Sequence, residues 1–178
     1  MQITIEENLS IRTVALTDVK SVFALTDTSR EILREWLPWL DMTNEEQHTR
    51  SHIEGCIADY EAKKSLSTVI IFQDKIVGRA SFNSINYSNK TVYIGYWLSP
   101  NAQGHGIMTK AVQTLCQYAF EELQFNKVEI HVAVENAKSR AIPERLGFVN
   151  EGTIRSAEWL YDHFVDHIVY GKLASEWV

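Results

Sequence analysis

The segment Gln103-Gly104-His105-Gly106-Ile107-Met108-Thr109 decides the fold, and it lies between a predicted strand and a predicted helix. Two glycines separated by one residue allow a sharp turn and a close approach of the backbone to a ligand. The first turn of the following helix has free amides at its positive end, which suits a pyrophosphate. The pattern also occurs in ordinary turns. It fits neither a P-loop, since no Lys-Ser or Lys-Thr follows, nor a dinucleotide fingerprint, since the third glycine is missing.

Before this segment the pattern predicts two helices among strands. Thr17 is the expected cap of a helix that begins at Asp18. Thr43-Asn44-Glu45-Glu46 reads as a capping box that opens a helix running to about Lys63. Runs of β-branched residues bounded by turn residues predict strands over 9–15, 66–72, 76–86 and 91–98.

After this segment helices and strands alternate. Met108, Val112, Leu115 and Ala119 recur at helical spacing, which predicts an amphipathic helix to about Leu123. A strand over 128–134, a short helix over 137–146, and strands over 148–155 and 164–172 complete the pattern. Antiparallel hairpins followed by a β-α-β-α-β half predict an α/β fold. We expect a mixed, mostly antiparallel twisted sheet with helices on both faces.

Composition predicts one soluble globular domain over residues 1–178, because 45% of the residues are hydrophobic and 22% are charged. The net charge of −6 disfavours direct nucleic acid binding and leaves basic peptides, amines and polyamines as partners. Cys56 and Cys116 have no metal or redox spacing and are expected to be buried free thiols. Since no apolar run approaches the roughly 18 residues of a membrane span, we expect a cytoplasmic protein without a membrane partner.

Four motifs in fixed order carry a resemblance to a known superfamily. They are Gly95-Tyr96-Trp97-Leu98, Gln103-x-x-Gly106-x-Met108, Asn136-x-x-Ser139 and Arg145-Leu146-Gly147-Phe148. Together they resemble the GNAT N-acetyltransferases, and among these the RimJ/RimL-like ribosomal-protein N-terminal acetyltransferases, nearest to the RimL type. Many family members have Ala or Gly where Met108 stands, and many have glutamate where Tyr93 stands. The resemblance implies a single GNAT domain in which two splayed parallel strands bind acetyl-CoA.

The resemblance places acetyl-CoA between strands at about 95–98 and 127–134. Backbone amides from Gly104 to Thr109 would hold the pyrophosphate, with Gln103 supporting the turn. A backbone amide of Trp97 or Leu98, at a strand bulge, would polarise the acetyl carbonyl. The implied cofactor contacts are Trp97, Leu98, Gln103, Gly104, His105, Gly106, Ile107, Met108, Thr109, Asn136 and Ser139, and no metal is implied.

The resemblance also implies catalytic residues. Ser139 would be the general acid that protonates the departing thiolate, the alternative being a surface serine behind a helix cap at Asn136. Pro143 cannot donate to the carbonyl of Ser139, so we expect that carbonyl to be free of the helix. Glu158 would be the base, the alternative being a solvated loop glutamate. Four aromatic residues are expected to line the acceptor cleft unless they are simply core: Trp36, Trp39, Tyr87 and Trp159.

The implied reaction transfers an acetyl group from acetyl-CoA to a primary amine, with the N-terminal amine of a ribosomal protein as the favoured acceptor. Two alternatives stay open: a small-molecule amine acetyltransferase acting on a polyamine or an antibiotic, and a non-catalytic acyl-CoA-binding module.

His48 and His52 lie four residues apart on a predicted helix, but no third metal ligand is evident. The hydrophobic end at 173–178 predicts docking on the core or in a homodimer contact, a hypothesis that rests on Trp177.

Overall fold

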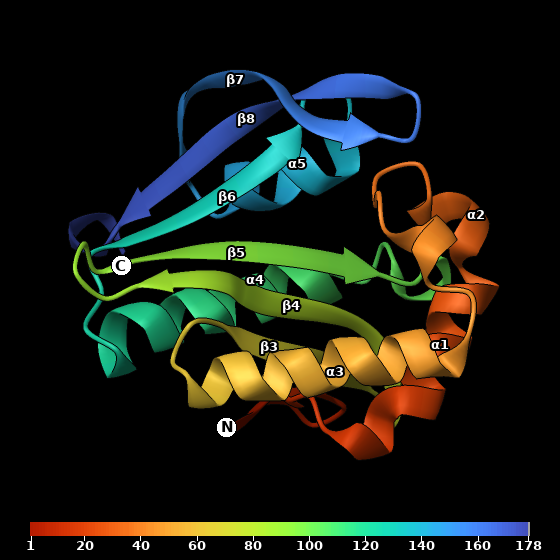
Figure 1. The fold of residues 1–178 in the computed structure, drawn as a ribbon. Helices are drawn as coiled ribbons and strands as arrows, with labels where there is room; N and C mark the ends of the chain where they lie inside the picture. Colours follow the sequence, from red (N-terminus) through yellow and green to blue (C-terminus); the bar gives the residue numbers. More distant parts are fainter. Residues whose placement is uncertain (178) are drawn as a thin grey trace.

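The computed structural model describes residues 1–177, and its framework is an eight-stranded sheet in the order β1-β2-β3-β4-β5-β6-β8-β7 (Figure 1). All neighbouring strands are antiparallel except β5 and β6. The predicted mixed, mostly antiparallel α/β sheet is therefore confirmed. The strands are β1 Gln2–Glu6, β2 Leu9–Thr13, β3 Leu66–Phe72, β4 Lys75–Asn86, β5 Thr91–Leu98, β6 Lys127–Ala133, β7 Val149–Leu160 and β8 His163–Leu173.

The parallel pair β5–β6 is short. It runs from Thr91 opposite Lys127 to Tyr93 opposite Glu129, and Figure 1 shows β6 diverging from β5 beyond this point. From Ile94 onwards, no strand within residues 1–177 pairs with this edge of β5. Its backbone N–H and C=O groups therefore have no sheet partner and are open to a ligand. The predicted splayed pair is confirmed.

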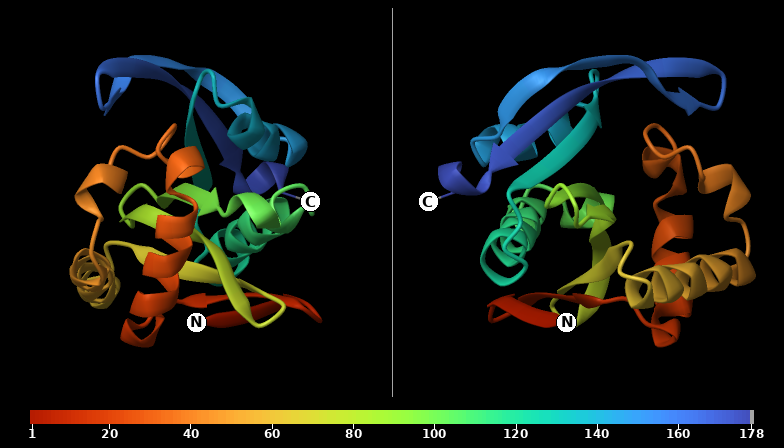
Figure 2. Two further views of the ribbon diagram at one scale, coloured as in Figure 1. Left: turned by 90° about the vertical axis from the view of Figure 1, so that its right-hand side faces the viewer. Right: turned by 60° about the vertical axis from the view of Figure 1, so that its left-hand side comes forward.

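Helices cover both faces of the sheet, as predicted (Figure 2). On one face, α1 Val19–Thr28 packs against β4 and α3 Glu46–Glu61 packs against β3. On the other face, α4 Ile107–Gln117 packs against β4 and β5, and α5 Ala137–Arg145 packs against β6 and α4. The remaining helical segments are short: Leu16–Asp18, α2 Arg30–Leu33, Leu40–Met42, Pro100–Ala102, the π-helical turn Tyr118–Glu122, and Ala174–Glu176.

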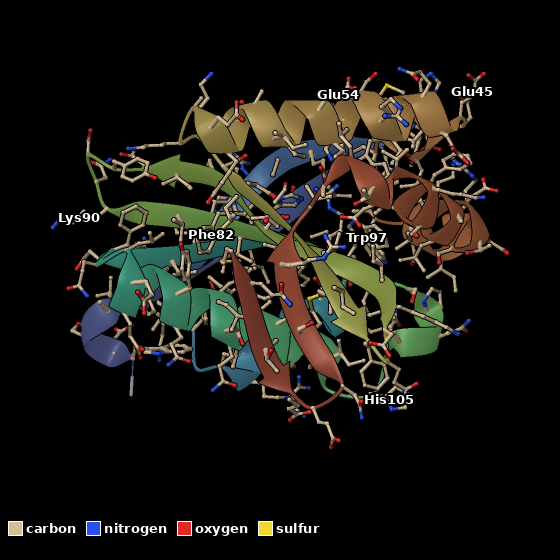
Figure 3. All side chains as sticks on the ribbon, turned by 90° about the horizontal axis from the view of Figure 1, so that it is seen from below. Glu45, Glu54, Phe82, Lys90, Trp97 and His105 are labelled. Carbon is tan, nitrogen blue, oxygen red and sulfur yellow. The ribbon has the colours of Figure 1, made fainter. Side chains whose placement is uncertain are left out.

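Two buried clusters stabilise these layers. The larger lies between the sheet and α4, and Phe82 sits within it (Figure 3). The smaller lies between the sheet and α1 and α3, and it contains Ile53 and Cys56. Trp177 packs on the larger cluster, with its ring 5.5 Å from that of Phe120, so the predicted docking on the core is confirmed for Trp177, and Val178 lies outside the described residues. Both cysteines are free and buried, as predicted.

Two predicted helix caps are wrong. The residue before α1 is Asp18 rather than Thr17, and its carboxylate accepts from the amide of Ala15 at 2.9 Å and pairs with Arg12. Instead of a local cap at Thr17, an ion pair between Asp18 and Arg12 connects the start of α1 to β2. At α3 the capping residue is Glu45 and no side chain caps the helix.

Two predictions about strands also differ from the structure. Strand β1 was not predicted; its side chains alternate between exposed and half-buried, so it lacks the apolar signal of the inner strands. Strand β7 was predicted to end at residue 155 but continues to Leu160 through two irregularities in its pairing with β8. This extension places Glu158 on a strand, so the alternative of a loop glutamate is wrong.

Candidate active site

A cleft of about 1790 Å³ opens where β5 and β6 separate. One end is bounded by the loop before α4 and by the start of α5, and the other end by the α1–α3 segment and the floor of β4. The cleft therefore joins two kinds of surface. All the predicted cofactor contacts line it except His105, which is exposed and lies at the outer end of its loop (Figure 3).

The glycine turn adopts backbone angles that favour glycine. Gly104 has φ +83°, and Gly106, which precedes α4 as its cap, has φ +72°. A Cβ atom at either position would meet nothing within 4 Å, so the conformation requires glycine and the space beside it remains open. No side chain caps α4, which leaves its first amides free at the cleft. Gln103 Nε2 donates to the carbonyl of Leu98 at 3.3 Å and ties the turn to the end of β5.

The strand bulge lies in β4 and not, as predicted, in β5. Trp97 and Leu98 pair regularly with β4, and the register shifts between Phe82 and Ser84. The inserted residue is Asn83, and a side chain on Gly95 would collide with it. A larger residue at position 95 would therefore force the side chain of Asn83 to move. Trp97 and Leu98 nevertheless line the cleft.

The start of α5 forms as predicted. Asn136 is the cap, and its Oδ1 accepts from the amide of Ser139 at 3.1 Å. Because Pro143 has no N–H, the carbonyl of Ser139 lacks its helical donor. The hydroxyl of Tyr96 on β5 donates to that carbonyl at 2.8 Å. Burial raises the pKa of Tyr96 far above its ordinary value, which keeps the phenol protonated as a donor. Tyr96 thus connects β5 to the start of α5, across the cleft and beside Ser139.

Glu158 faces the cleft from β7. Its Oε2 lies 3.4 Å from Nε2 of His167 on β8, and both side chains line the cleft. Tyr93 and His131 line the same region, with their rings 4.7 Å apart. Burial raises the pKa of Tyr93, and the charge of Glu158 adds to the rise. Burial also lowers the pKa of His131, so this ring is neutral at pH 7.

The four predicted aromatic residues divide into two pairs. Trp36 and Trp39 line the cleft from the segment after α2. Tyr87 lies outside the lining at the end of β4, with its ring 5.4 Å from that of Phe125. Trp159 also lies outside the lining and packs against Phe164 at 4.8 Å, because it follows Glu158 on a strand and points to the opposite side.

Sequence analysis missed a cluster on the cleft floor. Arg79 on β4 is buried, with its NH1 2.8 Å from Nε2 of His52 and its NH2 3.5 Å from Sγ of Cys56. Burial alone would raise the pKa of Cys56, but hydrogen bonds with His52 and Ser67 and the charge of Arg79 lower it to about 6. A single arginine in the small, apolar stretch 77–80 was the available signal.

Two features are missing from the part of the chain that the structure describes, a group of metal ligands and a membrane-spanning helix. No group of three or more His, Cys, Asp or Glu residues there could hold a metal ion. No helix there is long and apolar enough to cross a membrane.

The structure combines two splayed strands, a glycine turn before the uncapped helix α4, and the helix α5, which is capped by Asn136 and carries Ser139. This combination defines an acetyltransferase that uses acetyl-CoA. The profile for the acetyltransferase (GNAT) domain matches residues 8–149, and the chain belongs to this family, in its RimJ/RimL-like group. It is an acetyl-CoA-dependent N-acetyltransferase.

Three relatives show how far the similarity extends. The chain is 30% identical over 171 residues to the ribosomal-protein-serine acetyltransferase of Escherichia coli, covering 96% of each protein. It is 28% identical to a solved RimL, a ribosomal L7/L12 α-N-protein acetyltransferase in complex with coenzyme A, with a TM-score of 0.95 and 99% of each chain covered. It is 32% identical to the microcin C7 self-immunity acetyltransferase MccE, in complex with acetyl-CoA and AMP, with a TM-score of 0.92 and coverage of 96% of this chain and 95% of that one.

Proposed function

We propose that this enzyme acetylates the N-terminal α-amine of a protein, foremost a ribosomal protein. One observation carries the proposal: the cleft continues from the glycine turn to a second end lined by side chains, where Trp36 and Trp39 form a wall. An acceptor chain needs such a second entrance. The similarity to a ribosomal-protein-serine acetyltransferase along 96% of the chain supports the same acceptor class. A cytoplasmic location and a homodimeric state stay predictions.

The chemistry needs no nucleophile from the enzyme. The acceptor nitrogen attacks the acetyl carbonyl, a C–N bond forms, and the C–S bond to coenzyme A breaks. Neither Cys56 nor Cys116 lines the cleft, which agrees with direct attack. Unpaired amides at the end of β5, near Trp97 and Leu98, would stabilise the developing oxyanion; such donors are worth about 2.7–4 kcal/mol each.

Two side chains would move the protons. Glu158, half-buried beside His167, takes a proton from the incoming ammonium group. Ser139 gives its hydroxyl proton to the departing thiolate and recovers one from the acetylated nitrogen; the thiolate needs modest help because a thiol has a reference pKa of about 8.5. The two residues come from β7 and α5 and line one cleft. This placement supports a base and an acid acting on the same bound acceptor and donor.

The competing acceptor class is a small amine. A polyamine fits the cleft poorly. The buried guanidinium of Arg79 lies on the cleft floor and would repel the second ammonium group of the polyamine. The non-catalytic alternative predicts binding of acetyl-CoA without turnover. The non-catalytic alternative has no use for Glu158 and Ser139, whereas a small-amine acetyltransferase would use both, so only the acceptor separates the two enzymes.

The test is release of coenzyme A from acetyl-CoA across a panel of N-terminal peptides and free amines. We expect turnover with peptides, and Ser139→Ala lowering kcat about 100-fold with acetyl-CoA affinity nearly unchanged. Ser88→Ala, in an exposed turn, is the control. Acetylation of free amines but not of peptides would overturn the acceptor, and a large loss of acetyl-CoA affinity would make Ser139 a binding residue.

A further inference from the structure

Arg79 is a buried cation without a carboxylate partner. Its residue is 7% exposed, on the central strand β4. None of the ion pairs within residues 1–177 includes it. The nearby carboxylate of Asp18 is occupied by both terminal nitrogens of Arg12, at 2.6 and 2.7 Å. A buried charge is costly unless an anion or several hydrogen bonds compensate it.

The protein leaves much of this guanidinium unused. A guanidinium has five N–H donors in a planar fork. One meets Nε2 of His52 and one meets Sγ of Cys56. The buried Nε has no acceptor among residues 1–177, and each terminal nitrogen keeps a second hydrogen. Cys56, with its pKa lowered to about 6, carries a negative charge at pH 7 that balances the guanidinium from outside the lining of the cleft, whereas Arg79 itself lines the cleft and can offer its unused donors to an anion there.

His52 contacts the same cluster through one ring nitrogen. Its Nε2 lies 2.8 Å from NH1 of Arg79 and 3.5 Å from Sγ of Cys56, which leaves Nδ1 as the second polar atom of the ring. His52 is exposed on α3 and lines the cleft beside Arg79. The hydroxyl of Ser81 adds a further donor on the same floor. A carboxylate matches this set of donors in charge and in geometry.

We propose that Arg79 and His52 form a carboxylate-binding subsite for the acceptor. This rests on the proposed function, and it names a substrate class: an N-terminus with Asp or Glu in its first two residues. The distance follows from the sheet, because Arg79 is the register partner of Trp97, beside the expected acetyl position. Two extended residues span about 7 Å, so a third residue would carry its side chain past the subsite.

The charge of the whole protein argues in the opposite direction. With a net charge of −6, the enzyme as a whole repels an acidic peptide. A preference for Asp over its neutral isostere Asn must therefore come from local contacts. This makes the pair Asp and Asn a sharp probe of Arg79.

The experiment uses amidated peptides of one length with Asp or Asn at position 1, 2 or 3. We expect the wild-type kcat/KM to favour Asp about tenfold at position 1 or 2 and to be equal at position 3. Arg79→Gln should bring the ratio to about one, and Arg79→Lys should retain part of it because the fork is lost. Arg50→Gln, on the exposed side of α3, should keep the wild-type ratio.

The ratio of kcat/KM for the Asp peptide to that for the Asn peptide does not depend on the fraction of a variant that is folded. If a variant does not fold at all, the wild-type ratio alone tests the proposal. Equal rates for Asp and Asn peptides in the wild type, or an undiminished ratio in Arg79→Gln, would overturn the subsite and leave the proposed function standing. Turnover of free amines with no turnover of any peptide would overturn both.

Discussion

The two ends of the cleft are built from different materials. The end at the glycine turn presents backbone groups: the open amides of α4, the unpaired edge of β5, and glycines with positive φ. The other end presents side chains from α3, β4, β7 and β8, which meet only in the folded sheet. A backbone site depends on local conformation, which a short motif encodes. A side-chain site depends on registers between distant strands.

The comparison predicts that changes at the side-chain end alter turnover and acceptor use, whereas changes at the backbone end alter the binding of acetyl-CoA. The largest expected effect is at Glu158. Glu158→Gln should lower kcat by about 10²–10⁴-fold, because the acceptor ammonium loses its base. Steady-state kinetics measures this, and calorimetry should find acetyl-CoA affinity unchanged.

The control for that variant is Glu54→Gln, on the outer surface of α3 (Figure 3). It should leave kcat as in the wild type. If Glu158→Gln instead weakened acetyl-CoA binding with kcat preserved, the division of the cleft into two ends would be wrong.

The second effect is on folding stability, through the ion pair of Arg12 and Asp18 that holds α1 beside the side-chain end. Burial alone would raise the pKa of Asp18, but the hydrogen bonds from Arg12 and from the amide of Ala15, together with the charges of Arg12 and Arg79, outweigh it and lower that pKa below 3.8. The ion pair therefore stabilises the fold above pH 3.8, and its contribution disappears as the pH falls through the lowered pKa. Asp18→Asn should cost about 1.5–3 kcal/mol of unfolding free energy at pH 7.

Urea unfolding at pH 7 and in acid measures this difference, which should shrink in acid. Asp41→Asn is the matched control, because Asp41 pairs with Arg34 on the surface and should change stability far less. A difference for Asp18→Asn that is independent of pH would contradict the assignment.

The third prediction tests whether the backbone angle φ, rather than the space available to a side chain, is the reason for glycine at the backbone end. Gly106→Ala should cost about 1–2 kcal/mol, because φ +72° is unfavourable for alanine, and it should weaken acetyl-CoA binding. Gly55→Ala also meets nothing within 4 Å but lies inside α3, so it should stabilise the protein by about 0.5–1 kcal/mol. Denaturation of both variants checks the opposite signs, and equal signs would show that φ is not the cause.

The smallest effect is at Tyr96, where the two ends meet. Tyr96→Phe removes the donor to the carbonyl of Ser139 and should cost about 1 kcal/mol of stability, with a lower kcat because Ser139 shifts. Tyr87→Phe, on an exposed ring, should change neither. Unfolding curves and kinetics together test the link, and an unchanged kcat in Tyr96→Phe would confine Tyr96 to stability.

Sequence reasoning was accurate where short-range physics decides. The cap at Asn136, the carbonyl freed by Pro143 and the glycine turn each follow from a few neighbouring residues. The caps at Thr17 and Thr43 failed because a tertiary ion pair and a different helix start replaced them. The bulge was placed on the wrong strand, since insertion of Asn83 is visible only in the pairing of β4 with β5.

By itself the sequence determined the mixed sheet, the helix order and the backbone end of the cleft, because φ preferences and helix-end amides are local properties. The tertiary structure alone decided which side chains meet. Arg79 lies 27 residues from His52 and 23 from Cys56, and the Tyr96 hydroxyl reaches a carbonyl 43 residues away. Glu158 meets His167 only because β7 continues past its expected end and pairs with β8 in a shifted register. Strand register and helix placement set such encounters, and neither is encoded in a short motif.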